Sequence, residues 1–420
     1  MPAVREPMGR VPPERNLRMT ATIPTRVRAA APARQGTHRA LNALRAAAAV
    51  LVVVYHLRTL LFVDAAEAGD GALTRALYVV TGLGPAAVLV FFVLSGYWVG
   101  GSVLAAFRQD RFRWAGYATA RLSRLWIVLV PAVVLTAVLD HLGLALLGHT
   151  SIYLGDPAYH HTVPAADLAG RLDPLTALGN VGFLQTIAVP TYGTNASLWS
   201  LTYEAAFYAI FPLALYVWKG RGGAPARILN AVLLLAVCAL VGPAVLMYLP
   251  VWLLGAGVAL CRNRIAARLV ALRPLALTLA RAGATVALAA ALWATQASYS
   301  GRNVLLLAGA TTVLLALLVE DLHWSGGPGR VLDALSRYAE SSYSLYAIHL
   351  PIAALIAALL APQAAHRWAP SPAHWLALAG LSAVLVGVGW LFAWATERHT
   401  GHLRALLDGV IRAAARRTRA

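Results

Sequence analysis

The sequence has few charged residues and almost no cysteine. Only 12% of its 420 residues are charged, whereas 59% are hydrophobic. Because so few charged side chains cannot cover a soluble globule of this size, the composition excludes an ordinary soluble enzyme and predicts an integral membrane protein. The two cysteines, Cys238 and Cys261, both fall within apolar runs. They indicate neither a disulfide framework nor a metal site, so we expect no metal.

Long apolar runs take the place of the missing charge. Most of them approach the roughly 20 residues that a helix needs to cross a bilayer. The sequence therefore predicts an all-α integral membrane protein with about ten transmembrane helices. Two short runs flank Gly242-Pro243 and could form one broken element. The ten runs cover residues 41–63, 82–104, 125–147, 197–218, 227–244, 245–261, 275–296, 303–320, 343–360 and 374–396.

Acidic residues are the scarcer charge. There are 17 of them against 35 Lys and Arg, which gives a net charge of +18. If the N-terminus is cytoplasmic, 28 of the basic residues lie in cytoplasmic segments and only four in segments on the other side. This asymmetry follows the positive-inside rule, so it predicts that both termini lie in the cytoplasm. We expect a multi-pass protein of the cell (inner or plasma) membrane. The basic residues are then expected to meet membrane lipid, and no nucleic acid is expected as a partner.

The segments outside the apolar runs define the expected domains. Residues 1–40 carry Pro, Arg and Ala without apolar periodicity and predict a disordered basic cytoplasmic tail. We expect no removed signal peptide, with the first span acting as a signal anchor. A transmembrane domain of residues 41–400 follows, and a basic cytoplasmic tail covers 401–420. The extracytoplasmic loop 149–196 is long enough to favour a functional role and includes a possible half-buried element around 174–190.

Arg45 and His56 are the most informative residues, because both lie within the first apolar run. A charge at membrane depth costs several kcal/mol, so it usually has a function. Eleven residues at about 100° each come within about 20° of three full turns, which places both side chains on one helix face. They are roughly 16 Å apart along the axis. One helix therefore presents a guanidinium near one membrane surface and an imidazole deep in the membrane.

Three further motifs place polar groups at the membrane, and each also has a purely structural interpretation. Phe91–Tyr97 includes Ser95 next to a glycine, which close helix packing alone would explain. Arg121 and Arg124, at i and i+3, share a helix face and could clamp phosphate, although ordinary topological charge also explains them. The run 197–208 places Glu204 inside a span, as a structural buried carboxylate or as a functional one.

Glu204 and His56 are predicted to lie at the same depth. Each is about seven residues from the same end of its span, hence roughly 10 Å below that surface. Such a pair would keep the proton affinity of the imidazole near neutrality, which suits a base that deprotonates an alcohol. Tyr343, Tyr346 and His349 form another stripe, which an interfacial aromatic belt with a satisfied histidine would equally explain.

The motifs together resemble the acyltransferase 3 family of multi-pass membrane O-acyltransferases. The resemblance spans roughly residues 40–400. The first helix departs from the family pattern at Asn42, Ala43 and Ala46, and the last motif departs from it at His399. The matching segments, in the family's order, are Leu41 to His56 with its arginine, ten intervening residues and histidine; Phe91 to Gly96; the Arg121 and Arg124 pair; Leu198 to Tyr208; and Ser342 to His349.

The resemblance implies transfer of an acyl group, usually acetyl, from acyl-CoA to a hydroxyl of a carbohydrate or glycosylated acceptor such as a surface polysaccharide. His56 would then be the general base, or carry the acyl group transiently, with Glu204 assisting it. Arg45, Arg121 and Arg124 would hold the coenzyme phosphates. The residues implied for the substrate pocket are Tyr55, Ser95, Tyr203 and Tyr208, with Tyr346 and His349 nearer the cytoplasmic face.

Other functions compete with this interpretation. A macrolide-type small molecule could be acylated by the same chemistry. Polar residues at membrane depth also mark the substrate paths of solute transporters, although the sequence contains no inverted repeat. A non-catalytic scaffold is disfavoured because membrane-depth Arg, His and Glu are costly to keep without a function.

Overall fold

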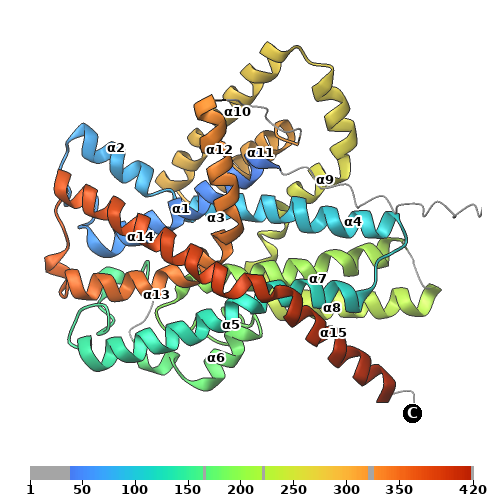
Figure 1. Ribbon diagram of the computed structural model, residues 1–420, viewed down its shortest axis with the longest axis horizontal. Coiled ribbons are helices and arrows are strands. Elements are labelled where there is room, and N and C mark those ends of the chain that lie inside the picture. Colours follow the sequence, from blue (N-terminus) through green and yellow to red (C-terminus); the bar gives the residue numbers. More distant parts are fainter. Residues whose placement is uncertain (1–37, 164–166, 220–222, 320–325, 418–420) are drawn as a thin grey trace, which may run out of the picture. The chain divides into compact units, whose positions relative to one another are not determined.

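The computed structural model describes residues 38–163, 167–219, 223–319 and 326–417 (Figure 1). Apart from its last three residues, the predicted N-terminal tail lies outside this part of the chain. Within these ranges every regular element is helical and no strand is present. The α-helices are α1 (Arg39–Leu61), α2 (Ala72–Thr81), α3 (Gly84–Ser95), α4 (Gly101–Arg108), α5 (Trp114–Leu147), α6 (Pro174–Val181), α7 (Trp199–Lys219), α8 (Gly223–Leu246), α9 (Leu249–Val270), α10 (Pro274–Ala297), α11 (Gly301–Leu317), α12 (Gly326–Tyr338), α13 (Ser342–Leu360), α14 (Pro372–Thr396) and α15 (Thr400–Arg417).

The all-α membrane class is confirmed. The ten predicted apolar runs are largely helical in the structure, although the run 82–104 is divided between α3, a π-helical turn and α4, and the run 245–261 between the end of α8 and α9. Eight helical stretches are long and apolar enough to cross a membrane in the described part of the chain. Of the predicted spans, α11 falls short of this measure with 17 residues, and α9 carries three arginines in its second half. The C-terminal segment predicted as a basic tail forms α15 as far as Arg417.

The predicted break at Gly242-Pro243 is present. Gly242 has φ 72° and ψ 177°, a conformation that residues with a side chain avoid, and it kinks α8 one turn before its end. Pro243 has no N–H to donate, so the regular helical hydrogen bond is lost at the same point. α9 then begins as a separate helix at Leu249.

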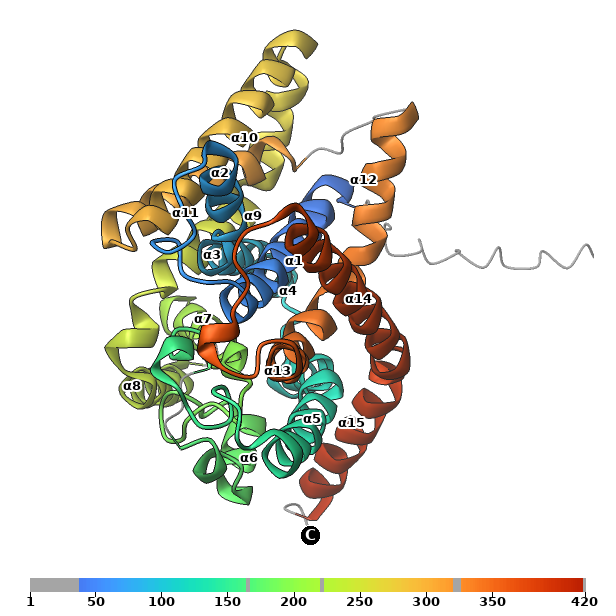
Figure 2. The same ribbon diagram turned by 90° about the vertical axis from the view of Figure 1, so that its left-hand side faces the viewer.

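α1 lies at the centre of the helices that build the site. It packs against α3 on one side and against α12, α13 and α14 on the others. Figure 2 shows α1 between these neighbours, with α3 and α14 on opposite sides of it. The residues of α1 that face these helices are largely small and apolar, which lets the neighbouring backbones approach closely. The two polar side chains identified from the sequence, Arg45 and His56, therefore lie in the interior of the helical domain.

α3 and α9 cross at very short range through two glycines. A Cβ atom at Gly96 would lie 1.9 Å from the carbonyl oxygen of Trp252, and one at Gly255 would lie 1.8 Å from that of Val93. No residue with a side chain fits at either position. The chain continues from α3 into a π-helical turn, Gly96–Gly100, before α4 begins. Such turns often occur at functional sites, and this one carries the aromatic side chain of Trp98 toward α1.

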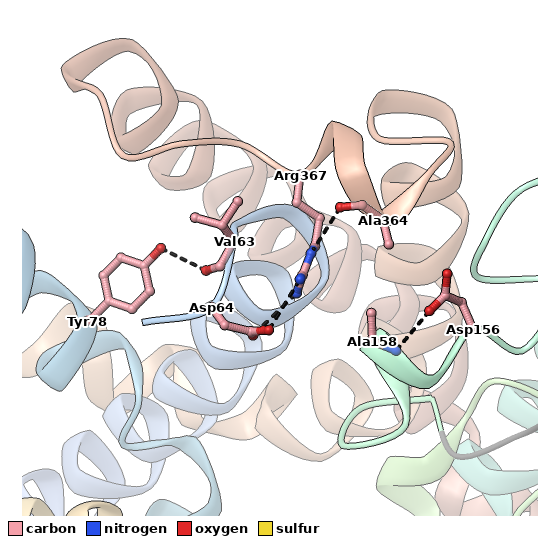
Figure 3. A network of polar contacts seen from close by, with 7 residues as sticks. All are labelled: Val63, Asp64, Tyr78, Asp156, Ala158, Ala364 and Arg367. Carbon is pink, nitrogen blue, oxygen red and sulfur yellow. Dashed lines mark hydrogen bonds and ion pairs between the residues drawn. The ribbon is translucent and has the colours of Figure 1, made fainter. Parts of the chain in front are cut away.

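The C-terminal end of α1 is held by two other segments (Figure 3). Arg367, which follows α13, pairs with the carboxylate of Asp64 at 3.2 and 3.3 Å and also donates to the carbonyl of Ala364 at 3.2 Å. Tyr78 of α2 donates its hydroxyl proton to the carbonyl of Val63 at 2.9 Å. These bonds fix the end of α1 five residues beyond His56.

The segment between α5 and α7 contains a short helix where the sequence suggested a half-buried element. Asp173 caps α6 by accepting from the N–H groups of Leu175 and Thr176. Nearer α7, the buried carboxylate of Asp140 in α5 accepts from the N–H of Thr194 at 2.7 Å and from its hydroxyl at 2.8 Å. The segment is thereby anchored to α5 immediately before α7 begins.

Candidate active site

His56 of α1 meets His349 of α13. Nδ1 of His56 lies 2.8 Å from Nε2 of His349, and the ring centroids are 4.9 Å apart. His349 has no exposed surface, whereas His56 is half-buried. The other nitrogen of His349, Nδ1, lies 2.8 Å from the carbonyl oxygen of Tyr346 and 3.2 Å from that of Leu345. A histidine pair of this kind can orient one ring and expose it to a substrate.

Glu204 lies in a second group of polar side chains. It accepts a hydrogen bond from the hydroxyl of Tyr208, one turn further along α7, at 3.0 Å. That hydroxyl lies 3.3 Å from Oγ of Ser95 in α3, which in turn accepts from the indole N–H of Trp252 at 3.2 Å. The chain of contacts links α7, α3 and α9 at the close glycine crossing. Glu204 and Tyr208 are both half-buried.

Arg45 occupies the centre of a cluster of charges. Its Nη2 donates to the carbonyl oxygen of Ala339, and its guanidinium lies 5.4 Å from the centroid of the Trp98 ring. Nε of Arg45 is buried and has no hydrogen-bond partner among the described residues. The charged groups close enough to act on it electrostatically, from four other segments, are Arg124, Glu397, Glu204 and Glu340.

Both arginines predicted on α5 face this cluster. Arg121 lies over the ring of Tyr117 at 5.8 Å, and its buried Nε has no hydrogen-bond partner in the described part of the chain. Tyr117 in turn donates to the backbone carbonyl of Tyr208 at 2.9 Å, which places Arg121 beside the Glu204 group. Arg124 is exposed and acts electrostatically on both Arg45 and Glu204. Guanidinium groups with free donors suit the binding of phosphate.

The structure thus divides the predicted site residues into two groups. Arg45, Arg121, Arg124, Glu204, Tyr208 and Ser95 come together at the charge cluster. Two tyrosine rings lie beside the histidine pair. The ring centroid of Tyr55 lies 5.1 Å from that of His56, and the ring centroid of Tyr346 lies 5.8 Å from that of His349. Tyr203 instead stacks on Phe92 and packs against Tyr248 within the apolar core.

The expected contact between His56 and Glu204 is replaced by other partners. The hydrogen bonds of the described residues join His56 to His349 and Glu204 to Tyr208. The sequence also placed His349 nearer the cytoplasmic face than His56, but the 2.8 Å contact puts the two rings at one level. The depth argument failed here because α13 continues a longer helical stretch, Gly329–Leu360, so that the start of its apolar run does not mark a membrane boundary.

Glu397 is a member of the cluster that the sequence singled out but did not place among the site residues. The run Glu397-Arg398-His399 follows the last span, and a simple helix cap would explain it. In the structure the Glu397 carboxylate accepts from the hydroxyl of Ser344 in α13 at 2.7 Å and acts electrostatically on Arg45.

The sequence also contains a glycosylation motif, Asn195-Ala196-Ser197, which the fold closes off. Asn195 has no exposed surface, and its side-chain amide donates to the hydroxyl of Thr136 at 3.1 Å and to the carbonyl of Ala347 at 2.8 Å. A modified amide could not keep both bonds. Asn195 therefore joins the segment before α7 to α5 and α13. Its partner in α13, Ala347, is the residue after Tyr346, whose carbonyl His349 contacts.

Comparison with known protein families shows the family of the chain. The family model of the acyltransferase domain that defines the acyltransferase 3 family matches residues 38–394, which include α1 with Arg45 and His56 and end shortly before Glu397. Curated proteins and solved structures give no match to the chain. The family match covers most of the sequence and confirms the resemblance inferred from its motifs. The chain therefore belongs to the acyltransferase 3 family and is a membrane acyltransferase.

Proposed function

We propose that the protein transfers an acyl group, acetyl in the first instance, from acyl-CoA to a hydroxyl of a carbohydrate or glycosylated acceptor at the cell membrane. The observation that carries the proposal is that α1 holds a guanidinium at one level and an imidazole at another. Arg45 and the neighbouring Arg121 each have an unused Nε donor, and the half-buried His56 lies about three turns further along the same helix. A phosphate-bearing donor and a base-requiring reaction would each find the groups they need.

In this proposal the coenzyme approaches from the cytoplasmic side and its phosphates bind to Arg45, Arg121 and Arg124. The free Nε donors of Arg45 and Arg121 support this assignment, because a buried guanidinium donor without a partner is costly until an acceptor arrives. Glu204 and Glu397 would balance the cluster's charge while the donor is absent.

His56 then acts as the general base. The acceptor hydroxyl attacks the thioester carbonyl as its proton moves to His56, so a carbon–oxygen bond forms and the carbon–sulfur bond breaks. The coenzyme leaves as a thiolate and takes the proton from His56, which restores the neutral imidazole. A thioester is already activated, so positioning and one base suffice for the chemistry.

Two substitutions on α1 test the proposal. Arg45→Ala should weaken acetyl-CoA binding by roughly 10–100-fold, the loss expected for one or two charge-assisted hydrogen bonds. His56→Ala should lower turnover by about 10²–10⁴-fold, as expected for a lost base, and leave donor binding within a few-fold. Arg302→Ala and His141→Ala serve as controls, because both residues are exposed on other helices.

The assay uses purified protein in detergent or nanodiscs with radiolabelled acetyl-CoA and a panel of oligosaccharide and macrolide acceptors. Label transferred to an oligosaccharide supports the proposed acceptor class, and transfer only to a macrolide replaces that class while keeping the chemistry. If the wild-type protein neither binds acetyl-CoA nor releases free coenzyme with any acceptor, the proposal is wrong. If His56→Ala retains full turnover, the role assigned to His56 is wrong.

A further inference from the structure

We propose that His349 is a positioning residue that fixes the proton of His56 on Nδ1 and so leaves Nε2 of His56 as the reacting base. The inference rests on the function proposed above. It deepens that function by assigning a specific nitrogen to the reaction and by giving a role to a histidine that contacts the base from a neighbouring helix.

The argument begins at the two backbone carbonyls beside His349. A carbonyl oxygen accepts hydrogen bonds and cannot donate them. Because Nδ1 of His349 lies 2.8 Å from the carbonyl oxygen of Tyr346 and 3.2 Å from that of Leu345, this nitrogen carries the proton and donates. In a neutral imidazole the second nitrogen is then an acceptor. Nε2 of His349 therefore presents a lone pair to its neighbour.

The same reasoning passes to His56. Its Nδ1 lies 2.8 Å from the accepting Nε2 of His349, so Nδ1 of His56 must be the donor. The remaining nitrogen, Nε2 of His56, then has no proton and is free to take one. His56 is half-buried and His349 fully buried, so of the two residues only His56 has surface through which a substrate could approach.

The backbone that sets this order is itself held in place. Pro351 lacks the N–H that would bond the carbonyl of Ala347 in a regular helix. Nδ2 of Asn195 donates to that carbonyl instead, at 2.8 Å. Oγ of Ser197 donates to Oδ1 of Asn195 at 2.6 Å and also lies 3.3 Å from the carbonyl oxygen of Tyr346, so the segment before α7 contacts the oxygen that orders His349. If α13 were flexible at this point, His349 could rotate away and would no longer fix the proton of His56 on Nδ1.

During transfer only one proton moves through the His56–His349 pair. The hydroxyl proton of the acceptor moves to Nε2 of His56 as the new carbon–oxygen bond forms, and the ring becomes an imidazolium. Its Nδ1–H then donates more strongly to His349, which spreads the positive charge without moving a second proton. The proton on Nε2 passes to the departing thiolate as the carbon–sulfur bond breaks. His349 plays the orienting part that a carboxylate plays in a Ser-His-Asp triad.

Two variants of His349 separate positioning from packing. Glutamine places Oε1 close to the position of the histidine Nε2 and can accept from His56, whereas leucine fills a similar volume without an acceptor. We expect His349→Gln to keep kcat within about tenfold of wild type and His349→Leu to lower it by about 10²-fold or more, the scale of a misassigned base. In both variants the KM for acetyl-CoA should stay within a few-fold, because the charge cluster is untouched.

A second measurement covers the case in which the leucine variant does not fold. His349→Ala leaves a cavity that added imidazole can fill with an acceptor nitrogen, whereas pyrrole has the same shape without an available lone pair. Imidazole, and not pyrrole, should restore kcat. Equal turnover of His349→Gln and His349→Leu, or equal rescue by the two compounds, would overturn the role of His349. Failure of the proposed function is recognised separately, because it would leave even wild-type protein without acetyl-CoA binding or coenzyme release.

Discussion

The close crossing of α3 and α9 predicts that alanine at Gly255 and at Gly257 will have opposite effects on stability. Both glycines lie in α9, two residues apart. A Cβ atom at Gly255 would lie 1.8 Å from the carbonyl oxygen of Val93, whereas one at Gly257 would have no heavy atom within 4 Å. The pair therefore isolates the contact with α3 from the general effect of replacing glycine by alanine in a helix.

The expected magnitudes follow from these distances. In a helix interior alanine is favoured over glycine by about 0.5–1 kcal/mol, so Gly257→Ala should stabilise the protein slightly. At Gly255 the same gain is opposed by overpacking against backbone, which cannot rotate away. Even a contact of 3.0 Å requires α9 to move by about 1.2 Å. Overpacking typically costs about 1–3 kcal/mol, so Gly255→Ala should be less stable than Gly257→Ala by about that amount.

The displacement should also reach the candidate site. The bond from the Trp252 indole to Ser95 is already 3.2 Å long, and a shift of about 1.2 Å would break it. Ser95 contacts the hydroxyl of Tyr208, which donates to Glu204, so Gly255→Ala should also reduce turnover. Thermal unfolding in one detergent and acetyl-CoA consumption measure the two effects. Equal melting temperatures for the two alanine variants would refute the reasoning.

Two further predictions concern the segment between α5 and α7. Asp140→Ala leaves the buried N–H and hydroxyl of Thr194 without an acceptor and should cost at least about 1–3 kcal/mol by chemical unfolding in micelles, with Asp140→Asn intermediate. Hydrogen bonds from the side chain and backbone of Thr176, and from the N–H of Leu175, lower the pKa of Asp173. Its stabilising contribution is therefore present above the ordinary carboxyl pKa and is lost as pH falls through the lowered value. Asp173→Asn, whose cap does not titrate, should lose less stability than wild type on acidification from about pH 6 to about pH 3, and an equal loss would contradict the role of the cap.

The helices that could be predicted from the sequence are those whose residues form continuous apolar runs. The ten runs are largely helical because a segment that crosses a bilayer must satisfy its backbone internally and present apolar side chains throughout. The helices without such a run were missed. α2, α12 and α15 are short or polar on one face. α5 begins at Trp114, but its apolar run begins only near Leu125 because the first turns of the helix carry Arg121 and Arg124, so the start of the helix was predicted too late.

The candidate site was predictable only as far as one helix can specify it. The 3.6-residue period is enough to place Arg45 and His56 on one face of α1, since both belong to the same helix. The partner of His56 lies 293 residues further along the chain. Its identity depends on how far α13 is shifted along α1, which is set by packing at small residues and by the bonds of Asn195 to α13. No period within a single segment carries that information.

The division between the two polar groups explains why His56 has a histidine for a partner and not a carboxylate. The acidic residues that reach this interior, Glu204 and Glu397, lie within electrostatic reach of Arg45, where they offset charge that would otherwise be costly at membrane depth. A carboxylate beside His56 would place a further charge at membrane depth. A neutral His349, ordered by backbone carbonyls, orients the ring without supplying a charge. In the proposed mechanism, separating the charges from the base by about three turns of α1 would let one helix bind an anionic donor at one level and accept a proton at another.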